Sequence, residues 1–235
     1  MLYIIGLGLD LKDISLRALE AIKKCDKVYL ETYTTTLPYK ISELEKLIKR
    51  DLISLDRDTV ESDFLIKEAK RQDIVLLVYG DPLAATTHIA LVREAKKEKV
   101  KFQVIHNTSI LNVISDTGLS LYKFGKTTSL PRWQENYKPT SFFQIIKENL
   151  SIGAHTLLLI DPGLSLREAL QELIEVDKSN ELTGKDIIVA SQLGTSEQTV
   201  FLGKIKQLIN KEIKIKEPFC LIVPAELGIG EEFLH

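Results

Sequence analysis

Ile74-Val75-Leu76-Leu77-Val78-Tyr79-Gly80-Asp81-Pro82 is the stretch that decides the fold of this chain. The apolar run at its start is typical of a strand buried on both faces of a parallel sheet. Gly80 and Pro82 end the strand, because glycine permits positive φ and proline removes a backbone donor. We therefore predict that Asp81 lies at the carboxyl end of a central strand, where open α/β sheets bind ligands. The same residues also fit an ordinary strand-to-helix turn in which Asp81 is only a turn residue.

Length and charge narrow the class of protein. The 235 residues suffice for one large or two modest domains. The net charge of −2 provides no global positive field, so we expect neither a nucleic acid nor a membrane as partner. Lysine alternates with glutamate at residues 67–68 and 94–99, which favours solvated helix faces there.

The two cysteines and the N-terminus indicate the compartment. Cys25 and Cys220 are far apart and form neither a disulfide framework nor a zinc-ligand spacing, so we expect buried reduced thiols. Residues 1–5 are apolar but lack a basic leader, and we expect a first strand rather than a signal peptide. No apolar run approaches the roughly 20 residues that span a bilayer. We therefore expect a soluble protein of the cytoplasm.

The first half of the chain alternates strands and helices. Expected strands lie at residues 2–7, 27–31, 74–79 and 102–105. Between them, Leu16, Leu19 and Ile22 predict one apolar helix face with Asp13 or Ser15 as its cap, and residues 42–45 predict a second helix with a capping box. Further helices are expected at 64–69 and 91–95, and from 109 onwards. Strands linked by helices of this length give a mainly parallel sheet.

The stretch from residue 119 to 137 interrupts this alternation with glycine, proline, tryptophan and many hydroxyl residues, so we place a domain junction near residues 120–125. The expected domains are residues 1–122 and 123–235. In the second we expect helices at 142–150 and, opened by the capping box of Ser165 and Glu168, from 165 onwards. Expected strands lie at 156–160, 187–190, 199–203 (antiparallel) and 219–223, which predicts a mixed sheet. The fold class is two α/β domains.

Several familiar chemistries find little support. The sequence Gly6-Leu7-Gly8 resembles a dinucleotide fingerprint, but Leu11 stands where a third glycine is needed, and no phosphate-binding glycine-lysine loop occurs. No serine nucleophile motif is present. The four histidines do not sit at metal-ligand spacing, so we expect no metal site. His88 and His106 each follow a strand and can line a cleft, whereas His155 is expected to be structural and His235 to be disordered at the terminus.

The expected strand ends carry small, apolar and backbone-rich sequence instead. They are Leu9, residues 81–84, residues 107–110, residues 160–162, and Leu202-Gly203. A pocket of this composition suits a compact cofactor held by main-chain groups better than it suits acid–base catalysis.

On these segments the chain resembles the diphthine synthases, members of the tetrapyrrole-methylase-like class of S-adenosyl-L-methionine-dependent methyltransferases. The resemblance covers almost the full length, at residues 4–9, 12–15, 28–34, 80–88, 104–110, 121–125 and 155–161. Gly80-Asp81-Pro82 alone indicates the broad class. The extension Ala85-Thr86-Thr87-His88 and the segment Tyr122-Lys123-Phe124-Gly125 are more specific.

The resemblance implies two α/β domains with the cofactor in the cleft between them. Carried over by position, its cofactor contacts are Leu9, Asp81, Ala84, Ser109, Ile110, Ile160, Leu202 and Gly228. Two of these depart from the family pattern. Leu202 is larger than the alanine that relatives often have, and Gly228 replaces a frequent histidine. The resemblance also implies a homodimer.

The implied reaction is stepwise methylation of the amino group of a modified histidine on translation elongation factor 2. Such a transfer mainly requires alignment and exclusion of water. The amine must lose a proton, which Asp81 can accept, although we expect Asp81 to hold the cofactor; we name no catalytic base. Trp133, Tyr137 and Lys138 can touch the protein substrate; the alternative is interdomain packing for Trp133 and solvent exposure for Lys138.

Three alternatives remain open. They are a tetrapyrrole methyltransferase of the same fold, a ribosomal RNA ribose methyltransferase, which the missing basic stripe disfavours, and a non-catalytic module that binds the cofactor.

Overall fold

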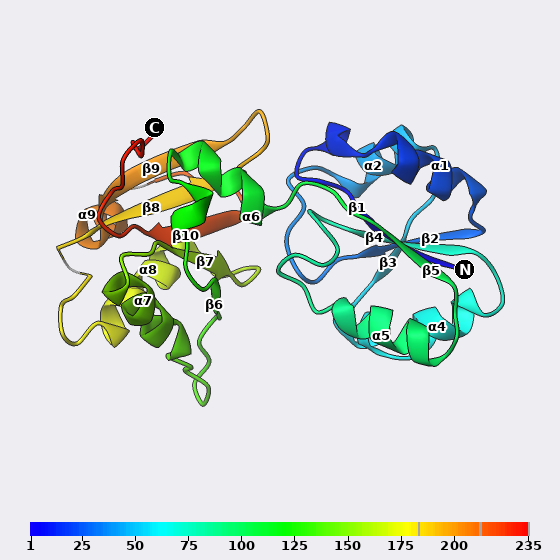
Figure 1. The fold of residues 1–235 in the computed structure, drawn as a ribbon, viewed down its shortest axis with the longest axis horizontal. Coiled ribbons are helices and arrows are strands. Elements are labelled where there is room, and N and C mark those ends of the chain that lie inside the picture. The colour runs from blue at the N-terminus through cyan, green and yellow to red at the C-terminus, as the bar shows by residue number, and fades with distance from the viewer. Residues whose placement is uncertain (183, 212, 235) are drawn as a thin grey trace. The chain divides into compact units, whose positions relative to one another are not determined.

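The computed structural model describes residues 1–182, 184–211 and 213–234. The chain divides into two compact units, Met1–Val113 and Ile114–His235. Each unit carries its own sheet and helices, which confirms the predicted class of two α/β domains (Figure 1). The expectation for His235 lies outside the described residues.

The first unit is built on a parallel sheet. Among the described residues, five strands form it in the order β3-β2-β4-β1-β5, and every neighbouring pair is parallel. They are β1 (Leu2–Gly6), β2 (Lys27–Glu31), β3 (Ile53–Leu55), β4 (Ile74–Val78) and β5 (Phe102–Ile105). Because β4 is the middle strand, the prediction that Asp81 follows a central strand is confirmed.

Helices cover both faces of this sheet, as Figure 1 shows. On one face lie α1 (Leu16–Lys24) and α2 (Ile41–Ile48), and on the other lie α4 (Phe64–Ala69) and α5 (Ile89–Lys97). Alternate residues of β4 enter the two cores: Ile74, Leu76 and Val78 pack on the α4/α5 side, and Val75 and Leu77 on the α1/α2 side. Burial on both faces explains why the strand is continuously apolar. Two short helices, α3 (Arg57–Glu61) and α6 (Ile110–Val113), complete the unit.

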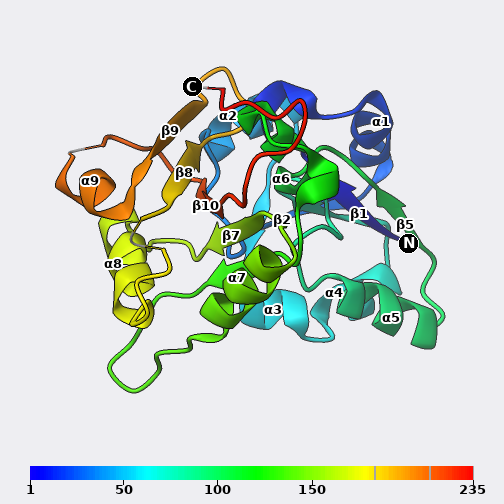
Figure 2. The ribbon, with the colours of Figure 1, turned by 60° about the vertical axis from the view of Figure 1, so that its left-hand side comes forward.

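The second unit holds a mixed sheet with the order β6-β7-β10-β8-β9 among the described residues (Figure 2). Here β6 (Thr128–Leu130) is parallel to β7 (Thr156–Ile160). The strands β10 (Phe219–Val223), β8 (Asp186–Ser191) and β9 (Thr199–Lys204) pair antiparallel with their neighbours. Side chains of α7 (Ser141–Ser151), α8 (Leu166–Val176) and α9 (Ile205–Asn210) share one core with this sheet.

Two helix starts agree with the predicted capping residues. Ser15 caps α1, and its hydroxyl accepts from the amide of Ala18 at 3.1 Å. Ser165 and Glu168 form the predicted capping box of α8, in which each side chain accepts from the other residue's amide at 3.3 and 3.0 Å.

Two predictions about helices are wrong. The apolar face predicted for α1 is confirmed at Ile22, which is buried, and at Leu19, which packs partly buried against the same core, but it is wrong at Leu16, which is 80% exposed. The buried face consists of Ala18, Ala21 and Ile22, and Leu16, two residues before Ala18, lies on the opposite side of the helix. The capping box predicted at residues 42–45 does not form. Instead α2 begins at Ile41, and Glu43 reaches back to the amide of Lys40 at 2.9 Å.

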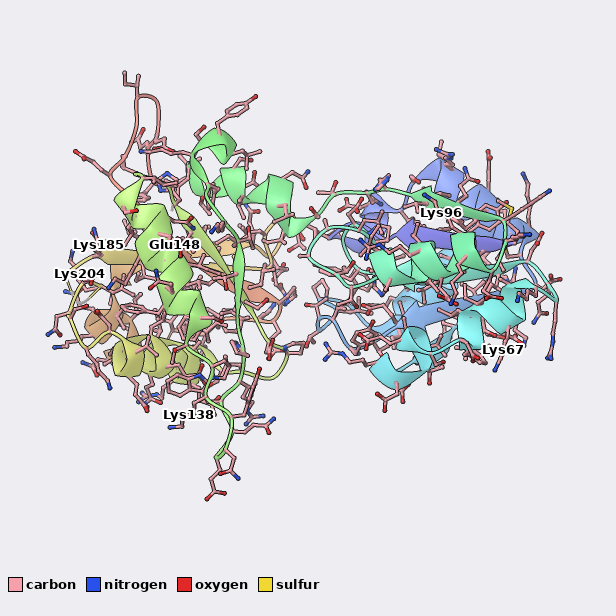
Figure 3. All side chains as sticks on the ribbon, turned by 60° about the horizontal axis from the view of Figure 1, so that its bottom comes forward. Lys67, Lys96, Lys138, Glu148, Lys185 and Lys204 are labelled. Carbon is pink, nitrogen blue, oxygen red and sulfur yellow. The ribbon has the colours of Figure 1, made fainter. Side chains whose placement is uncertain are left out.

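The prediction of solvated helix faces is confirmed for the lysines but is wrong for Glu68. Lys67 and Lys96, labelled in Figure 3, lie on exposed faces of α4 and α5. Glu68 is 13% exposed, because its carboxylate accepts from Lys27 at 2.6 Å and from the Tyr29 hydroxyl at 2.8 Å.

Both cysteines are buried free thiols, as predicted. Burial raises the pKa of Cys25 to about 11 and that of Cys220 to about 12, so both thiols remain protonated and unreactive near neutral pH. None of the helices that the structure describes is long and apolar enough to cross a membrane. Residues 114–122 belong to the second unit, and a domain boundary after residue 122 stays a prediction.

Candidate functional site

The turn after β4 is joined to the loop after β1. Gly80 has φ +73°, and it exchanges two backbone hydrogen bonds with Gly8, at 2.9 and 3.1 Å. A side chain at Gly6 would place its Cβ 2.5 Å from the Gly80 carbonyl oxygen. Glycine is therefore needed at position 6 because the loops approach closely, and at position 80 because its φ is positive.

Asp81 is the charged centre of this turn, and its side chain is 11% exposed. Its Oδ1 accepts from the amide of Leu83 at 2.9 Å. Its Oδ2 accepts from the amide of Asn107 at 3.1 Å and from Nδ1 of His106 at 2.8 Å. Asp81 thus ties the segment that follows β5 to the segment that follows β4.

The loop that carries Leu9 is held from both sides. The amides of Leu9 and Asp10 donate to Oδ2 of Asp13 at 3.0 and 2.9 Å. The Leu9 carbonyl accepts from the hydroxyl of Tyr79 at 3.0 Å, and burial raises the pKa of Tyr79, which keeps that hydroxyl protonated. The side-chain Nδ2 of Asn107 donates to the carbonyls of Gly6 and Asp13 at 3.1 and 3.0 Å. This loop is accordingly preorganised.

The segment from Asp81 to His88 forms a compact turn. The amide of Ala84 donates to the Asp81 carbonyl at 3.3 Å. The Pro82 carbonyl accepts from the Thr86 hydroxyl at 2.6 Å and from Nδ1 of His88 at 3.2 Å. A carbonyl only accepts, so Nδ1 of His88 carries the proton. Burial lowers the pKa of His88, which keeps the ring neutral.

A buried carboxyl group lies behind this turn. The side chain of Glu31, at the end of β2, is 1% exposed, and its Oε2 lies 3.8 Å from Nε2 of His88 without a hydrogen bond. The Thr34 hydroxyl donates to the other oxygen. Burial raises the pKa of Glu31, so its neutral form is favoured. His88 therefore supports the turn from inside the unit. The prediction that His88 can line a cleft is wrong, because its ring is buried.

Ser109 and Ile110 begin α6. Ser109 is 7% exposed, and its amide donates to the side-chain oxygen of Asn112 at 2.8 Å. A Cβ built on Gly80 would lie 3.8 Å from Ser109 Cα and 3.9 Å from Leu9 Cδ2. The structure thus brings Leu9, Asp81 and Ser109 together around the Gly80 turn, with Ala84 and Ile110 on the adjoining segments.

The second-unit residues expected at the site do not form one local cluster. Ile160 is the last residue of β7, whereas Leu202 lies on β9 opposite Ile188. Two strands, β10 and β8, separate β7 from β9 in the sheet. Gly228 follows β10, and its amide donates to Oε2 of Glu231 at 2.6 Å.

Glu231 holds the segment that contains Gly228. Its side chain is 2% exposed and accepts from the Ser120 amide at 2.8 Å, from Nε2 of His155 at 2.9 Å and from Lys123 Nζ at 3.2 Å. Burial by itself raises the pKa of Glu231, but these bonds and that from Gly228 outweigh it and hold the pKa at about 2. His155 is fully buried and its Nδ1 accepts from the Ala225 amide, so it is structural, as predicted.

The aromatic loop before α7 packs within its own unit. Trp133 donates from its amide to Glu172 at 3.0 Å and from its indole to the Pro139 carbonyl at 3.0 Å. Lys138, labelled in Figure 3, lies 5.0 Å from the Trp133 ring centre and 3.3 Å from Glu175. These contacts of Trp133 and Lys138 are all with residues of the second unit.

The donor set of the first unit fits S-adenosyl-L-methionine. It combines one buried carboxylate, backbone amides and carbonyls, and small or aliphatic side chains from three loops, around a glycine without a side chain. Asp81 accepts three hydrogen bonds and has room for one more from a hydroxyl or ammonium group. Lysine and arginine do not occur among the expected contacts, which suits a cofactor that lacks phosphate.

Sequence comparison assigns the chain to a class of protein. Residues 1–209 match the family model for Tetrapyrrole (Corrin/Porphyrin) Methylases. The chain is 41% identical to the diphthine methyl ester synthase of Schizosaccharomyces pombe, over 91% of this chain and 85% of that protein. It is 38% identical to the diphthine synthase of Methanococcus maripaludis, over 99% of this chain and 96% of that protein.

Structure comparison gives the same result. A crystal structure of a diphthine synthase superposes with a TM-score of 0.86 at 35% identity, covering 97% of this chain and 92% of that one. The chain therefore belongs to the tetrapyrrole methylase family and, within it, to the diphthine synthases.

Sequence reasoning missed the residues that hold the site together. The bonds and contacts described above are made by Asp13, Tyr79, Asn107 and Glu31, and none of these bonds was predicted, although Asn107 lies in the expected strand-end segment 107–110. A signal was present for Asn107 and Glu31, since each is polar and stands at the carboxyl end of an expected strand.

Proposed function

We propose that this protein is an S-adenosyl-L-methionine-dependent N-methyltransferase that methylates the amino group of the modified histidine of elongation factor 2 in diphthamide biosynthesis. The observation that carries the proposal is the similarity to diphthine and diphthine methyl ester synthases at 38–41% identity over nine-tenths or more of the chain. The preorganised strand ends around Asp81 provide a place for the cofactor.

In the proposed site each residue has a limited task. When bound, the cofactor supplies a methyl group on a sulfonium that is already activated for transfer. Asp81 would accept a hydrogen bond from it, and Leu9 and Ser109 would supply apolar and main-chain contacts around Gly80. Ala84 and Ile110 extend these contacts, and we include Ile160, Leu202 and Gly228 of the second unit on the basis of the family resemblance. The chain orients the reactants and excludes water, which is most of what methyl transfer requires.

The membership of the family favours this proposal over a tetrapyrrole methyltransferase, because the similar proteins named above are diphthine-modifying enzymes. It likewise favours catalysis over a non-catalytic module. We propose further that the protein acts as a homodimer in the cytoplasm. Light scattering coupled to size-exclusion chromatography tests the dimer, which would give twice the 26.6 kDa of the chain.

A second candidate is the formation of a methyl ester after the amine has been methylated. The name of the Schizosaccharomyces pombe relative, a diphthine methyl ester synthase, favours it. The Methanococcus maripaludis relative is named only a diphthine synthase, at nearly the same identity. The two outcomes differ in the number of methyl groups transferred.

The deciding experiment is methyl transfer to elongation factor 2 that carries the partly modified histidine, followed by intact mass. We expect stepwise gains of single methyl groups, three for the amine alone and four if an ester forms. Alkaline treatment removes only the ester. An unchanged mass, with cofactor bound in calorimetry, would instead support the non-catalytic module.

A further inference from the structure

His106 differs from the other histidines that the structure describes. Its side chain is 64% exposed, whereas His88 and His155 are at most 1% exposed. In His88 the Nδ1 proton is committed to a backbone carbonyl, and in His155 both ring nitrogens have partners inside the second unit. Among the residues that the structure describes, His106 is thus the histidine whose ring is accessible to solvent or to a substrate.

The partner of His106 determines which of its nitrogens carries the proton. Nδ1 lies 2.8 Å from Oδ2 of Asp81, an oxygen that also accepts from the Asn107 amide at 3.1 Å. Because this carboxylate oxygen can only accept hydrogen bonds, Nδ1 must donate and therefore carries the proton. The neutral ring then keeps its lone pair on Nε2. A buried carboxylate that orients an exposed imidazole in this way is the usual arrangement of a general base.

The position of the pair matches the proposed site. Asp81 follows β4 and His106 follows β5, which are the two neighbours of β1, so both residues stand at the carboxyl edge of the first sheet. Leu9 follows β1 between them. The ring is therefore anchored to the same carboxylate that we assign to the cofactor.

We propose that His106 is the catalytic residue that accepts the proton from the acceptor amine, with Asp81 as the positioning residue; this inference rests on the proposed function. An ammonium group has no lone pair and must lose a proton before it attacks. That proton passes to Nε2 of His106. The amine lone pair then forms the nitrogen–carbon bond as the sulfur–carbon bond breaks, and the sulfonium leaves as a neutral thioether. The imidazolium returns its proton to water, which its exposure permits.

This assignment distinguishes the two kinds of methyl transfer. Each methylation of the amine needs one deprotonation, because the product of each step is again a cation. A carboxylate near neutral pH is already ionised and needs none. His106 therefore serves the amine steps and not the ester step.

Two variants isolate the role of the ring. His106→Asn places an amide donor toward Asp81 but has no group that accepts a proton. His106→Ala leaves space that added imidazole can fill. Two measurements are independent of catalysis. Nitrogen-15 NMR of the wild-type ring without cofactor reports which nitrogen carries the proton, and calorimetry gives the affinity for S-adenosyl-L-methionine.

We expect NMR to show the proton on Nδ1, and the affinity of His106→Asn for the cofactor to stay within about threefold of wild type. Amine methylation should slow by about 100-fold or more in both variants, and imidazole should restore part of the rate in His106→Ala only. If ester formation occurs, its rate on an already trimethylated acceptor should be unchanged in His106→Asn.

Other outcomes overturn the assignment. If the wild type methylates the amine and the His106→Asn variant does so at an equal rate, the role of His106 is refuted and the proposed function stays intact. A proton on Nε2 in the free protein refutes it as well. A wild-type protein that binds the cofactor but transfers no methyl group to elongation factor 2 refutes the proposed function, and this inference with it.

Discussion

Glu231 offers a quantitative test of how the second unit holds its C-terminal segment. Its carboxylate is 2% exposed and accepts from two amides, His155 and Lys123, which join residues 120–123 to residues 226–231. The substitution Glu231→Gln removes the charge and places an amide group against donors. We expect it to destabilise the second unit strongly.

The magnitude follows from the pKa. Hydrogen bonds hold the pKa of Glu231 at about 2, against an ordinary value of 4.5. At about 1.4 kcal/mol per pH unit, this difference corresponds to about 3.5 kcal/mol of unfolding free energy. Because the folded pKa is the lower one, the stabilisation is present in full above about pH 5.5 and is lost as the pH falls from about 4.5 toward 2.

Urea unfolding of wild type and Glu231→Gln across this pH range measures the effect. The difference in unfolding free energy should be about 3.5 kcal/mol at pH 7 and should shrink by more than half near pH 3. Glu232→Gln is the matched control, since it removes one charge from an exposed neighbour and should cost under about 0.5 kcal/mol. A difference at pH 7 as small as that of the control, or one that does not change with pH, would refute this account of Glu231.

Two further substitutions test the packing of each unit. Gly8→Ala should lower the unfolding free energy by at least about 2 kcal/mol and weaken cofactor binding, because φ is +76° and the new Cβ would lie 2.3 Å from Asp13 Cβ. The control is Gly153→Ala, where φ is +70° but the space around the new Cβ is open, and it should cost only about 1 kcal/mol of unfolding free energy. Thermal unfolding and calorimetric titration check both, and equal effects of the two would contradict the clash. Asn149→Ala should lower the unfolding free energy measured with urea by about 2–4 kcal/mol, because the buried side-chain amide of Asn149 donates to the Lys126 carbonyl at 2.8 Å and accepts from the Lys126 amide at 3.0 Å. A cost under about 0.5 kcal/mol would mean that these bonds contribute little.

The framework of the fold was predictable because each strand carries its own signal. The residues of β4 are apolar without interruption since helices bury both faces of the sheet, and the glycine and proline that follow mark its end. The position of Asp81 at the middle of the sheet edge follows from this pattern. Ser165 and Glu168 marked a helix start because their spacing matches the hydrogen bonds of a capping box.

Features that depend on tertiary contacts were not predictable. The apolar spacing of Leu16 with Ile22 suggested that both are buried, but the core lies against Ala18, Ala21 and Ile22, and Leu16 is exposed on the other side of α1. The sequence predicts Glu68 on the surface, but its carboxylate is bonded by Lys27 and Tyr29, which lie 39 or more positions away in the sequence. The pairing of His106 with Asp81 spans 25 residues, and only the parallel order of β4, β1 and β5 brings the two together.

Calorimetric titration with S-adenosyl-L-methionine tests the central claim most directly, namely that the strand ends around Asp81 hold this cofactor. We predict one binding site per chain in the wild type and an affinity lower by at least about tenfold in Asp81→Ala, in line with the loss of one charge-assisted hydrogen bond. An absence of binding heat at several temperatures, or an Asp81→Ala variant with unchanged affinity, would contradict the claim.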